Sequence, residues 1–445
     1  MNPKIAANQQ RRFLEFLGVL RPHVATDAAL PRRIKEIFSR DRAIGSRDRR
    51  LYRELLYTAL RHWPWVDGAR QRGDGQTAGL APTAGSEAGG ARSAGAHRAR
   101  DEQPGLLDTN PDDAAKLTAW LAADGKSTSA YRAAHCGDWP APEKSLSGRA
   151  GQLQQVLGRV FDPQALLPPW FKEHCPAAFE PPNLDVLHTR APLWVRLQVV
   201  ERSLVLDEFR KREWPWQEFP GVPDALNLPP DADVGGTDAH RRGFVEIQDL
   251  GSQLVLLHAP VQAGQRWLDA CAGAGGKTLQ LAHLVGEKGR VDAADIRAEI
   301  LDELRERASR ARLANVRIVT GPSETYDGVL VDAPCSGSGT WRRSPHLKWV
   351  TTPEMIAKLA ATQLAILSDN AARVGPGGVL VYATCSLSSQ ENQAVVAAFL
   401  LAHQDFTAEP PAKDWGGVRD EHGTTLMPAA HDTDGFYIAV LRRKA

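Results

Sequence analysis

The fold is decided by the stretch Arg266-Trp267-Leu268-Asp269-Ala270-Cys271-Ala272-Gly273-Ala274-Gly275-Gly276-Lys277-Thr278, where an apolar run stops at a cluster of small residues and a helical pattern follows. This pattern predicts a strand, a tight glycine turn and a helix. Its glycines carry no Cβ atom that would keep a ligand off the backbone. Because the N–H groups at the helix start would face that ligand, the turn predicts a site for a nucleotide-like cofactor.

Two well-known nucleotide-binding motifs do not match this turn. A phosphate-binding P-loop needs glycine where Cys271 stands, and a dinucleotide fingerprint needs a third glycine where Thr278 stands. An acid does follow at a suitable distance, since Asp295 ends the next expected strand and lies 22 residues after Gly273. That spacing suits a ribose with free hydroxyl groups. A glycine turn that binds no ligand is the alternative for this loop taken alone.

Strand and helix patterns alternate after residue 243, which predicts a parallel sheet. The expected strands are 267–269, 291–295, 316–319, 329–332 and 379–383, and helical stretches include 298–313 and 353–373. Residues 435–441 form a last strand with no helix after it, which fits an antiparallel edge strand. The predicted fold class is therefore α/β, a Rossmann-like, mostly parallel sheet with an antiparallel edge strand.

The length of 445 residues indicates two or three domains. Residues 1–160 are predicted to form an all-α domain, because apolar residues recur at helical spacing at Phe13, Phe16, Leu17 and Leu20, and again at Leu51, Leu55, Leu56, Ala59 and Leu60. Within it, residues 68–105 hold Leu80 as their only large aliphatic or aromatic side chain, which predicts a flexible insertion. Residues 161–242 are predicted to be a small mixed linker subdomain, and residues 243–445 the α/β domain.

Composition excludes several classes of protein. Net charge is +1 overall, but residues 1–63 carry 14 Lys or Arg against 6 Asp or Glu. This local excess of positive charge favours binding of a polyanion; the alternative is a solvated helical face. Five irregularly spaced cysteines indicate neither a disulfide framework nor a zinc site. No apolar run is long enough to span a bilayer. We therefore expect a cytoplasmic protein, a monomer, with no metal and no membrane partner.

The predicted linker is rich in proline and tryptophan, as in Pro168-Pro169-Trp170-Phe171 and Pro192-Leu193-Trp194-Val195-Arg196-Leu197. Aromatic side chains next to arginine can stack on bases. In a short segment such residues more often form a core, so both interpretations stay open.

Two cysteines follow neighbouring expected strands, in Asp332-Ala333-Pro334-Cys335-Ser336-Gly337 and Ala383-Thr384-Cys385-Ser386. Ligands of doubly wound sheets bind at the carboxyl ends of strands, and neighbouring strands lie about 4.8 Å apart. Cys335 and Cys385 are therefore expected to converge beside the glycine turn, near Asp332 and Lys277. For either cysteine taken alone, the alternative is an inert core residue.

A thiolate beside a nucleoside-type cofactor suits covalent catalysis on cytosine. Carbon 5 of the ring is a poor nucleophile, but thiolate addition at carbon 6 gives an enamine that can attack a sulfonium methyl group. The step also needs a proton or hydrogen bond at N3, followed by loss of the carbon-5 proton and expulsion of the thiol. Asp332 is the candidate for the contact with N3.

These segments resemble one known family, the RNA cytosine-5 methyltransferases of the RsmB/NSUN type. The resemblance covers residues 243–442 and rests on motifs in family order: Gln248-Asp249 with Gln253, the 271–278 turn, the 332–337 segment, Arg342-Arg343-Ser344-Pro345-His346-Leu347-Lys348-Trp349, the 383–386 segment, Gln390-Glu391-Asn392, and Asp434-Gly435-Phe436. More loosely, the N-terminal region resembles the NusB-type RNA-binding helical domain, with the nearest match at residues 46–61, and the segment 168–197 resembles the RNA-gripping linker of the family.

The resemblance implies a class I methyltransferase that uses S-adenosylmethionine. The implied cofactor-binding residues are Cys271, Ala272, Gly273, Ala274, Gly275, Gly276, Lys277, Asp332 and Asp295, the last on the ribose. Cys385 is implied as the nucleophile, and Cys335 as the residue that helps release the product. Asp332 and Lys277 complete the catalytic set. DNA cytosine methyltransferases attack with the Pro-Cys cysteine, so these roles rest on kinship and not on spacing.

Three positions depart from the family pattern. Gly321-Pro322 stands where the family has Gly-Asp, whose carboxylate meets the adenine amino group, and Ser323 or Glu324 is the candidate substitute. A lost hydrogen bond there would cost about 0.5 to 1.5 kcal/mol. Ala274 replaces proline, and His346 replaces an acid in a segment expected to bear on the RNA contact.

We therefore predict an S-adenosylmethionine-dependent methyltransferase that forms 5-methylcytosine in RNA, most plausibly small-subunit rRNA. A transfer RNA methyltransferase is one alternative. A non-catalytic RNA-binding or ribosome-assembly protein, which lost cofactor binding through Pro322, is another, although the cysteine pair with Lys277 and Asp332 argues against it. A nicotinamide oxidoreductase is disfavoured because the third fingerprint glycine is missing.

Overall fold

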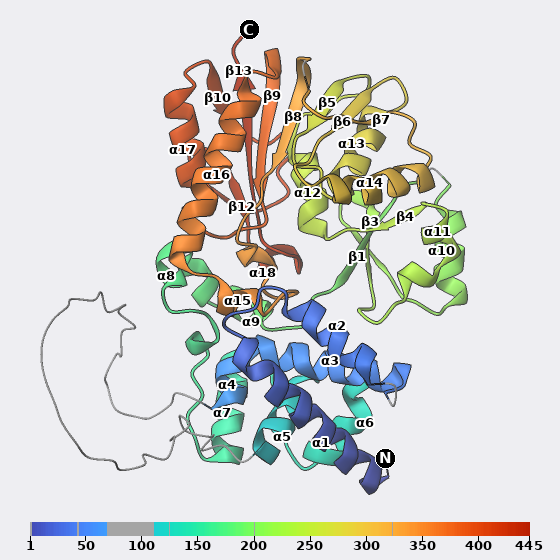
Figure 1. Ribbon diagram of the computed structural model, residues 1–445, viewed down its shortest axis with the longest axis vertical. Coiled ribbons are helices and arrows are strands. Elements are labelled where there is room, and N and C mark those ends of the chain that lie inside the picture. Colours follow the sequence, from blue (N-terminus) through green and yellow to red (C-terminus); the bar gives the residue numbers. More distant parts are fainter. Residues whose placement is uncertain (1, 42–43, 69–110, 124, 200, 323) are drawn as a thin grey trace, which may run out of the picture.

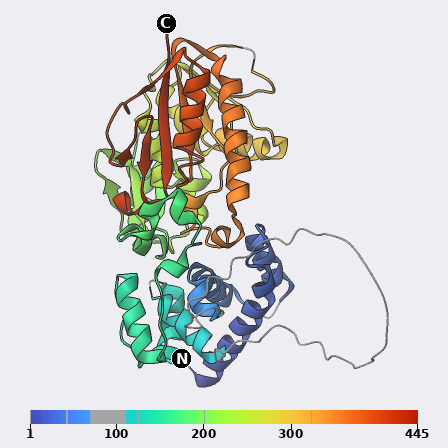
Figure 2. The same ribbon diagram turned by 90° about the vertical axis from the view of Figure 1, so that its left-hand side faces the viewer.

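The computed structural model describes residues 2–41, 44–68, 111–123, 125–199, 201–322 and 324–445. The predicted insertion 68–105 lies, apart from Gly68, outside these described residues. Figure 1 shows a helical region at the N-terminal end, a small β-subdomain beside it, and a large sheet flanked by helices that ends at the C-terminus. Figure 2, turned by 90°, shows the helical region and the sheet domain as successive blocks along the long axis.

The helical region buries the side chains that the sequence periodicity singled out. Phe13, Leu55 and Ala59 are fully buried in its core. The first helix begins favourably, because the Asn2 side chain accepts a hydrogen bond from Lys4 N and Pro3 occupies the first turn. The helices are α1 (Pro3–Leu20), α2 (Leu30–Arg40), α3 (Ser46–Arg61), α4 (Trp63–Asp67), α5 (Pro111–Leu121), α6 (Ser129–Cys136) and α7 (Leu146–Leu157).

The same core continues past residue 160. Leu166, Phe171 and Phe179 are buried in it, together with side chains of the short helices α8 (Phe171–His174) and α9 (Asn183–Leu187). This core is thus continuous across residue 160, and it also includes Trp341, Ile356, Leu387 and Met427 from the sheet domain. Because the apolar pattern there is broken by proline, periodicity could not show which core these residues join.

The β-subdomain is an antiparallel sheet in the strand order β2-β3-β1-β4. Its elements are β1 (Leu193–Leu197), α10 (Ser203–Lys211), β2 (Gln217–Phe219), β3 (Val222–Leu228), α11 (Asp238–Arg241) and β4 (Val245–Ile247). Val195, Phe209 and Val245 meet in its core, so the subdomain extends past residue 242. Phe171 and Trp194 are 0% and 6% exposed, which favours the core interpretation of the aromatic residues in this stretch.

The large sheet has the order β11-β12-β13-β9-β8-β5-β6-β7, and β10 also pairs with β13. Its strands are β5 (Arg266–Asp269), β6 (Arg290–Ala293), β7 (Val316–Ile318), β8 (Tyr326–Asp332), β9 (Val374–Thr384), β10 (Phe406–Glu409), β11 (Val418–Arg419), β12 (Thr424–Leu426) and β13 (Phe436–Arg443). Strands β9, β8, β5, β6 and β7 are parallel. The predicted α/β class is confirmed.

The last strand is antiparallel, as predicted, but it does not form the edge of the sheet. β13 pairs with β9 on one side, and β10 and β12 pair with it on the other. The strands β10–β12 are short and polar, so their sequences carry too little alternation to be recognised as strands.

Opposite faces of the sheet are covered by different helices. Trp267 packs with α12 (Leu250–His258) and α13 (Gly276–Val285) on one face, while its neighbour Leu268 lies in the core with α16 (Pro353–Ala371) and α17 (Gln393–Ala402) on the other. Helix α14 (Ala298–Arg310) follows β6. No helix is described between β7 and β8.

A short helix, α15 (Leu347–Val350), joins the sheet domain to the helical region. The buried Lys348 Nζ lies 2.8 Å from Arg61 O and 3.0 Å from Leu166 O, and Trp349 Nε1 donates to Leu60 O at 2.9 Å. Burial holds the pKa of Lys348 well below its usual range. No helix within the described ranges combines the length and apolar character needed to cross a membrane.

Candidate active site

The predicted glycine turn joins β5 to α13, and two of its glycines have backbone angles that disfavour other residues. Gly273 has φ +51° and Gly275 has φ +91°. A Cβ on Gly275 would also lie 2.8 Å from the side chain of Leu304, which belongs to α14. Gly275 therefore allows α13 and α14 to pack closely, while the rest of the turn stays open to a ligand.

A pocket of about 860 Å³ opens at the carboxyl ends of β5, β6 and β8. Eight of the nine predicted cofactor-binding residues line it, and Gly275 is the exception because it packs on Leu304. The others are Cys271, Ala272, Gly273, Ala274, Gly276, Lys277, Asp295 and Asp332. This volume is within the range typical of small-molecule sites.

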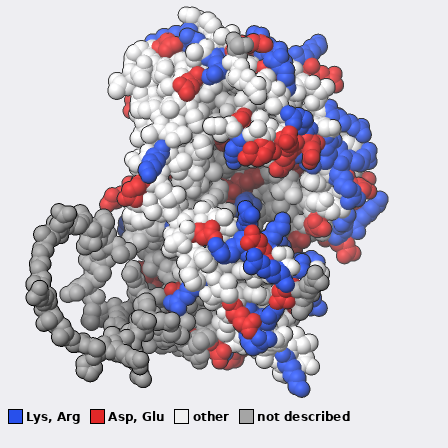
Figure 3. Space-filling view, in the orientation of Figure 1, with Lys and Arg blue, Asp and Glu red and all other residues white. Residues whose placement is uncertain are grey.

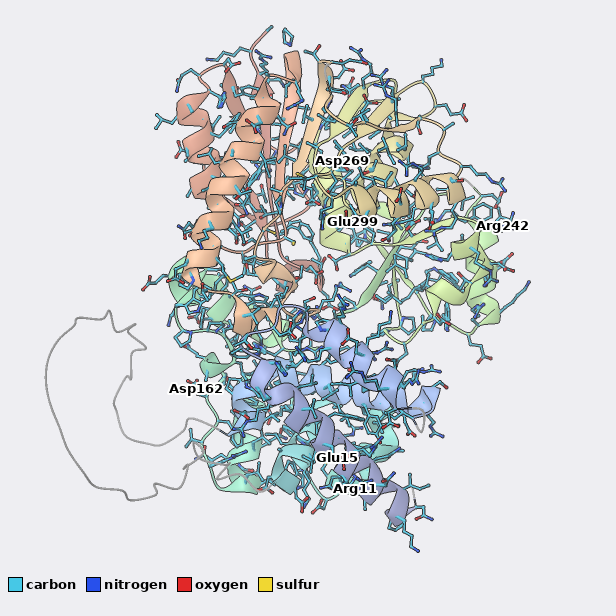
Figure 4. The ribbon with its side chains drawn as sticks, in the orientation of Figure 1. Arg11, Glu15, Asp162, Arg242, Asp269 and Glu299 are labelled. Carbon is cyan, nitrogen blue, oxygen red and sulfur yellow. The ribbon has the colours of Figure 1, made fainter. Side chains whose placement is uncertain are left out.

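Asp269 is a pocket residue that the sequence reasoning missed. It ends β5, and Figure 4 labels it inside the sheet domain. Its carboxylate is 1% exposed; Oδ2 accepts a hydrogen bond of 2.7 Å from Thr278 Oγ1, whereas Oδ1 has no well-formed partner in the described chain. Burial raises the pKa of Asp269 to about 7, against the lowering effects of Thr278 and of the Cys271 backbone. An acid directly before the glycine turn was the available signal.

Asp295 lies where the spacing predicted, at the end of β6. Its Oδ2 accepts a hydrogen bond of 2.9 Å from Gly273 N, and its Oδ1 accepts from Arg297 N and Nε at 2.9 and 3.1 Å. Burial alone would raise its pKa, but the hydrogen bonds from Arg297 and Gly273 lower it below the usual value. The carboxylate is therefore ionised at neutral pH, and the Arg297 side chain that pairs with it is 56% exposed.

The loop that holds Pro322 contributes to the outer wall of the pocket. Pro322 lines the pocket, whereas Glu324 does not and pairs with Arg290 at the start of β6 and with Arg317 of β7, so it is not the substitute acceptor that the sequence suggested. Ser323 lies outside the described residues. The side chain of Ile296 lines the pocket while being 99% exposed, so the wall offers an uncovered apolar surface.

Lys277 and Asp332 form an ion pair at the pocket floor. Lys277 Nζ lies 2.8 Å from Asp332 Oδ2 and 5.1 Å from the centre of the Phe436 ring. Burial opposes the charge of Lys277, but the Asp332 carboxylate outweighs it and raises the lysine pKa. The pair holds Asp332 in a fixed position, and 30% of that side chain remains exposed to the pocket.

The two predicted cysteines meet as expected. Cys335 Sγ lies 3.4 Å from Cys385 Sγ, both are free thiols, and both are partly exposed. The hydrogen bond with Cys385, together with burial, holds the pKa of Cys335 well above its usual range. Cys335 therefore favours its protonated form beside the sulfur of Cys385.

Cys271 is not a third nucleophile. Burial, with the nearby carboxylates of Asp269 and Asp332, raises its pKa far above the usual value, so it stays a thiol. It forms part of the wall of the pocket.

His346 does not lie where an RNA contact was expected. The side chain is 4% exposed and rests against the backbone of Ala28 in the helical region. Its segment instead joins the domains, because Arg342 O accepts a hydrogen bond of 3.2 Å from Arg61 Nε. Sequence alone cannot distinguish a basic segment that binds RNA from one that binds a neighbouring domain.

The pocket fits S-adenosylmethionine. The unsatisfied Oδ1 of Asp269 is an acceptor for an ammonium group, Asp295 is an acceptor for hydroxyl groups, and the apolar face of Ile296 suits a nucleobase. Among the described residues, no group of three or more His, Cys, Asp or Glu side chains is arranged to hold a metal ion.

The fold and this pocket together define a class I methyltransferase that uses S-adenosylmethionine. Residues 255–442 match the model of the family described as 16S rRNA methyltransferase RsmB/F. The chain is 32% identical over 314 residues to the ribosomal RNA small subunit methyltransferase B of Yersinia pestis bv. Antiqua (strain Angola), which covers 66% of this chain and 72% of that protein. The chain belongs to the RsmB/F methyltransferase family.

Other relatives agree. The probable ribosomal RNA small subunit methyltransferase B of Bacillus subtilis (strain 168) is 32% identical over 277 residues, or 59% of this chain and 62% of that protein. The chain thus spans about three fifths of the length of that relative. A solved methyltransferase homolog from Pyrococcus horikoshii is 26% identical, with a TM-score of 0.52 over 58% of this chain and 89% of its own.

Proposed function

We propose that this protein transfers a methyl group from S-adenosylmethionine to carbon 5 of a cytosine in small-subunit rRNA, through a covalent adduct with Cys385. The observation that carries the proposal is the cysteine pair, with sulfurs 3.4 Å apart beside a pocket that holds Asp332. The names of the relatives support rRNA as the substrate class. A non-catalytic role is disfavoured because a binding protein has no use for two adjoining thiols.

When bound, S-adenosylmethionine supplies the electrophilic sulfonium methyl group. Asp269 and Asp295 would hold its amino and ribose groups, and the start of α13 would hold its carboxylate. Lys277, Asp332 and Cys335 line the same pocket, so Asp332 would be able to contact both the cofactor and the target base.

The residues of this chain account for the steps on cytosine. The Cys385 thiolate adds to carbon 6, and the electron pair of the 5,6 double bond moves to carbon 5, which takes the methyl group. When its carboxyl carries a proton, Asp332 donates a hydrogen bond to N3, and this bond stabilises the negative charge that develops on the ring. A water molecule then accepts the proton at carbon 5, the electron pair of the carbon–hydrogen bond restores the 5,6 double bond, and the bond from carbon 6 to Cys385 breaks with release of the thiolate. Cys335 adjoins the carbon–sulfur bond that breaks, and we assign it to this release.

The surface offers a basic face for RNA. Figure 3 shows Lys and Arg side chains gathered over α10 and α11, and a hollow where the helical region meets the upper domains. The exposed basic residues of these helices and their ends are Arg210, Lys211, Arg212, Arg241 and Arg242. Three of these arginines pair with acids of the same helices, Arg210 with Asp207, Arg212 with Glu208 and Arg241 with Asp238, so the face carries both charges and gives only weak support for RNA as the partner.

The direct test is methyl transfer to defined RNA. We expect purified full-length protein to label small-subunit rRNA, and nucleoside analysis of the digested product to identify 5-methylcytosine. Transfer RNA and rRNA with the target cytosines replaced by uridine are the controls. Label in transfer RNA alone would establish the alternative substrate, and cofactor binding without any label would favour the non-catalytic alternative.

Asp295→Ala is expected to weaken S-adenosylmethionine binding about ten- to hundredfold in a calorimetric titration, because hydrogen bonds to a charged acceptor contribute about 1.5 to 3 kcal/mol. The matched control is Asp302→Ala, which removes an exposed carboxylate of α14 paired with Arg305. We expect the control to bind like the unmodified protein. Absence of binding by the folded unmodified protein would contradict the cofactor site.

A further inference from the structure

One buried carboxylate connects the two cysteine loops beneath the thiols. Glu391 is 0% exposed and lies in the turn between β9 and α17. Its Oε1 accepts hydrogen bonds from Ser336 N at 2.8 Å and Gln363 Nε2 at 3.0 Å. Its Oε2 accepts from Ser336 Oγ at 2.5 Å and from Ser386 Oγ at 2.6 Å. Three of these four donors therefore belong to the residues that directly follow Cys335 and Cys385.

Burying a carboxylate is costly unless hydrogen bonds replace its water. No Lys, Arg or His donates to Glu391 within the described part of the chain, so neutral donors alone compensate the charge. Charge-assisted hydrogen bonds are short and directional, which makes the carboxylate a rigid joint between the loops.

The backbone at this turn is held independently of the carboxylate. Tyr382 Oη donates to Glu391 O at 2.6 Å, and Asn392 Nδ2 donates to Ser386 O at 2.9 Å. The loops also bond to each other directly, since Gly339 N donates to Cys385 O at 2.9 Å. These contacts hold the fold, whereas the Glu391 side chain joins the residue after one thiol to the residue after the other.

We infer that Glu391 is a positioning residue, which fixes the relative placement of Cys335 and Cys385 for covalent catalysis. The inference rests on the proposed function. The negative charge of Glu391 acts in the same direction as the hydrogen bond and burial that raise the pKa of Cys335, so it helps to keep that thiol protonated. The side-chain hydrogen bonds of Glu391 go to Ser336, Gln363 and Ser386, so it acts on the two thiols through their loops.

The test is Glu391→Gln, which preserves size but removes the charge and places an amide donor against other donors. We expect kcat to fall about 10²-fold, since small misplacement of reacting groups costs that much, while the KM for RNA and the affinity for S-adenosylmethionine stay within about twofold. Glu391→Asp should recover part of kcat. Glu303→Gln, an exposed change on α14, is the matched control and should leave all three quantities unchanged.

A second measurement reports on the thiols without any methyl transfer. Iodoacetamide alkylation, mapped by peptide mass spectrometry as a function of pH, should show that Cys335 reacts at lower pH in Glu391→Gln than in the unmodified protein. A purely structural role would not shift this profile in a folded variant. Unchanged kcat with an unchanged Cys335 profile would overturn the inference.

Two further outcomes remain decisive. If Glu391→Gln does not fold, Ser386→Ala removes one donor and leaves the carboxylate in place; a lower kcat with normal cofactor affinity would support the inference, and an unchanged kcat would overturn it. If the unmodified protein methylates no RNA, the proposed function fails, yet the alkylation profile still tests whether Glu391 controls the thiols.

Discussion

Cys335→Ala is expected to accumulate a covalent complex with RNA, whereas Cys385→Ala forms none. The two sulfurs are 3.4 Å apart, so both are within reach of the same base, and only their roles separate them. In the proposed mechanism Cys385 makes the bond to carbon 6, so its removal should lower kcat by several orders of magnitude, as loss of a covalent nucleophile does. Without Cys335, attack and methylation proceed but release is slow, so the adduct persists.

The measurement is a denaturing gel of protein incubated with S-adenosylmethionine and labelled small-subunit rRNA. A slow-migrating band that survives the detergent reports the adduct. Cys175→Ala, at a buried cysteine of the helical core, is the control and should behave like the unmodified protein. The reverse pattern, with an adduct in Cys385→Ala only, would exchange the roles of the two cysteines.

Asp332→Asn is expected to lower kcat by about 10²- to 10⁴-fold, the usual contribution of a residue that handles a proton or developing charge. Asparagine keeps the size of the side chain but cannot supply a proton or a full negative charge. Lys277 would also lose the carboxylate 2.8 Å away that keeps it charged, which should weaken cofactor binding as well.

Single-turnover methyl transfer with saturating S-adenosylmethionine separates these two effects. The matched control is Asp327→Asn, at the opposite end of the same strand, where the carboxylate accepts a hydrogen bond from Arg266 N. Because asparagine can still accept that bond, the control should retain normal rates. If Asp332→Asn changes only the affinity for the cofactor, Asp332 has no role at the base.

Much of the candidate site could be predicted because it depends on local sequence and one rule of topology. The glycine turn is a local pattern, and parallel strands present their carboxyl ends at a single edge. These two facts suffice to bring Cys271, Lys277, Asp332 and the two later cysteines together. The separation of the sulfurs follows from the adjacency of β8 and β9, which the sequence order of the strands also suggested.

Other parts of the site could not be predicted from the sequence, because they depend on which groups find a partner in the folded chain and which do not. The free oxygen of Asp269, the exposed face of Ile296 and the pairing of Glu324 with Arg290 are results of packing between elements far apart in the chain. The burial of His346 could not be predicted either, because this side chain is covered by the helical region, where it rests against the backbone of Ala28.

The sequence by itself determined the alternation of strands and helices, the glycine turn, and the residues placed at the strand ends, because each follows from periodicity or from the lack of a side chain at glycine. Only the tertiary structure decided where one core ends and the next begins, that β13 lies inside its sheet, and that Glu391 joins both cysteine loops. These features depend on hydrogen bonds and apolar contacts between distant segments, which no local pattern records.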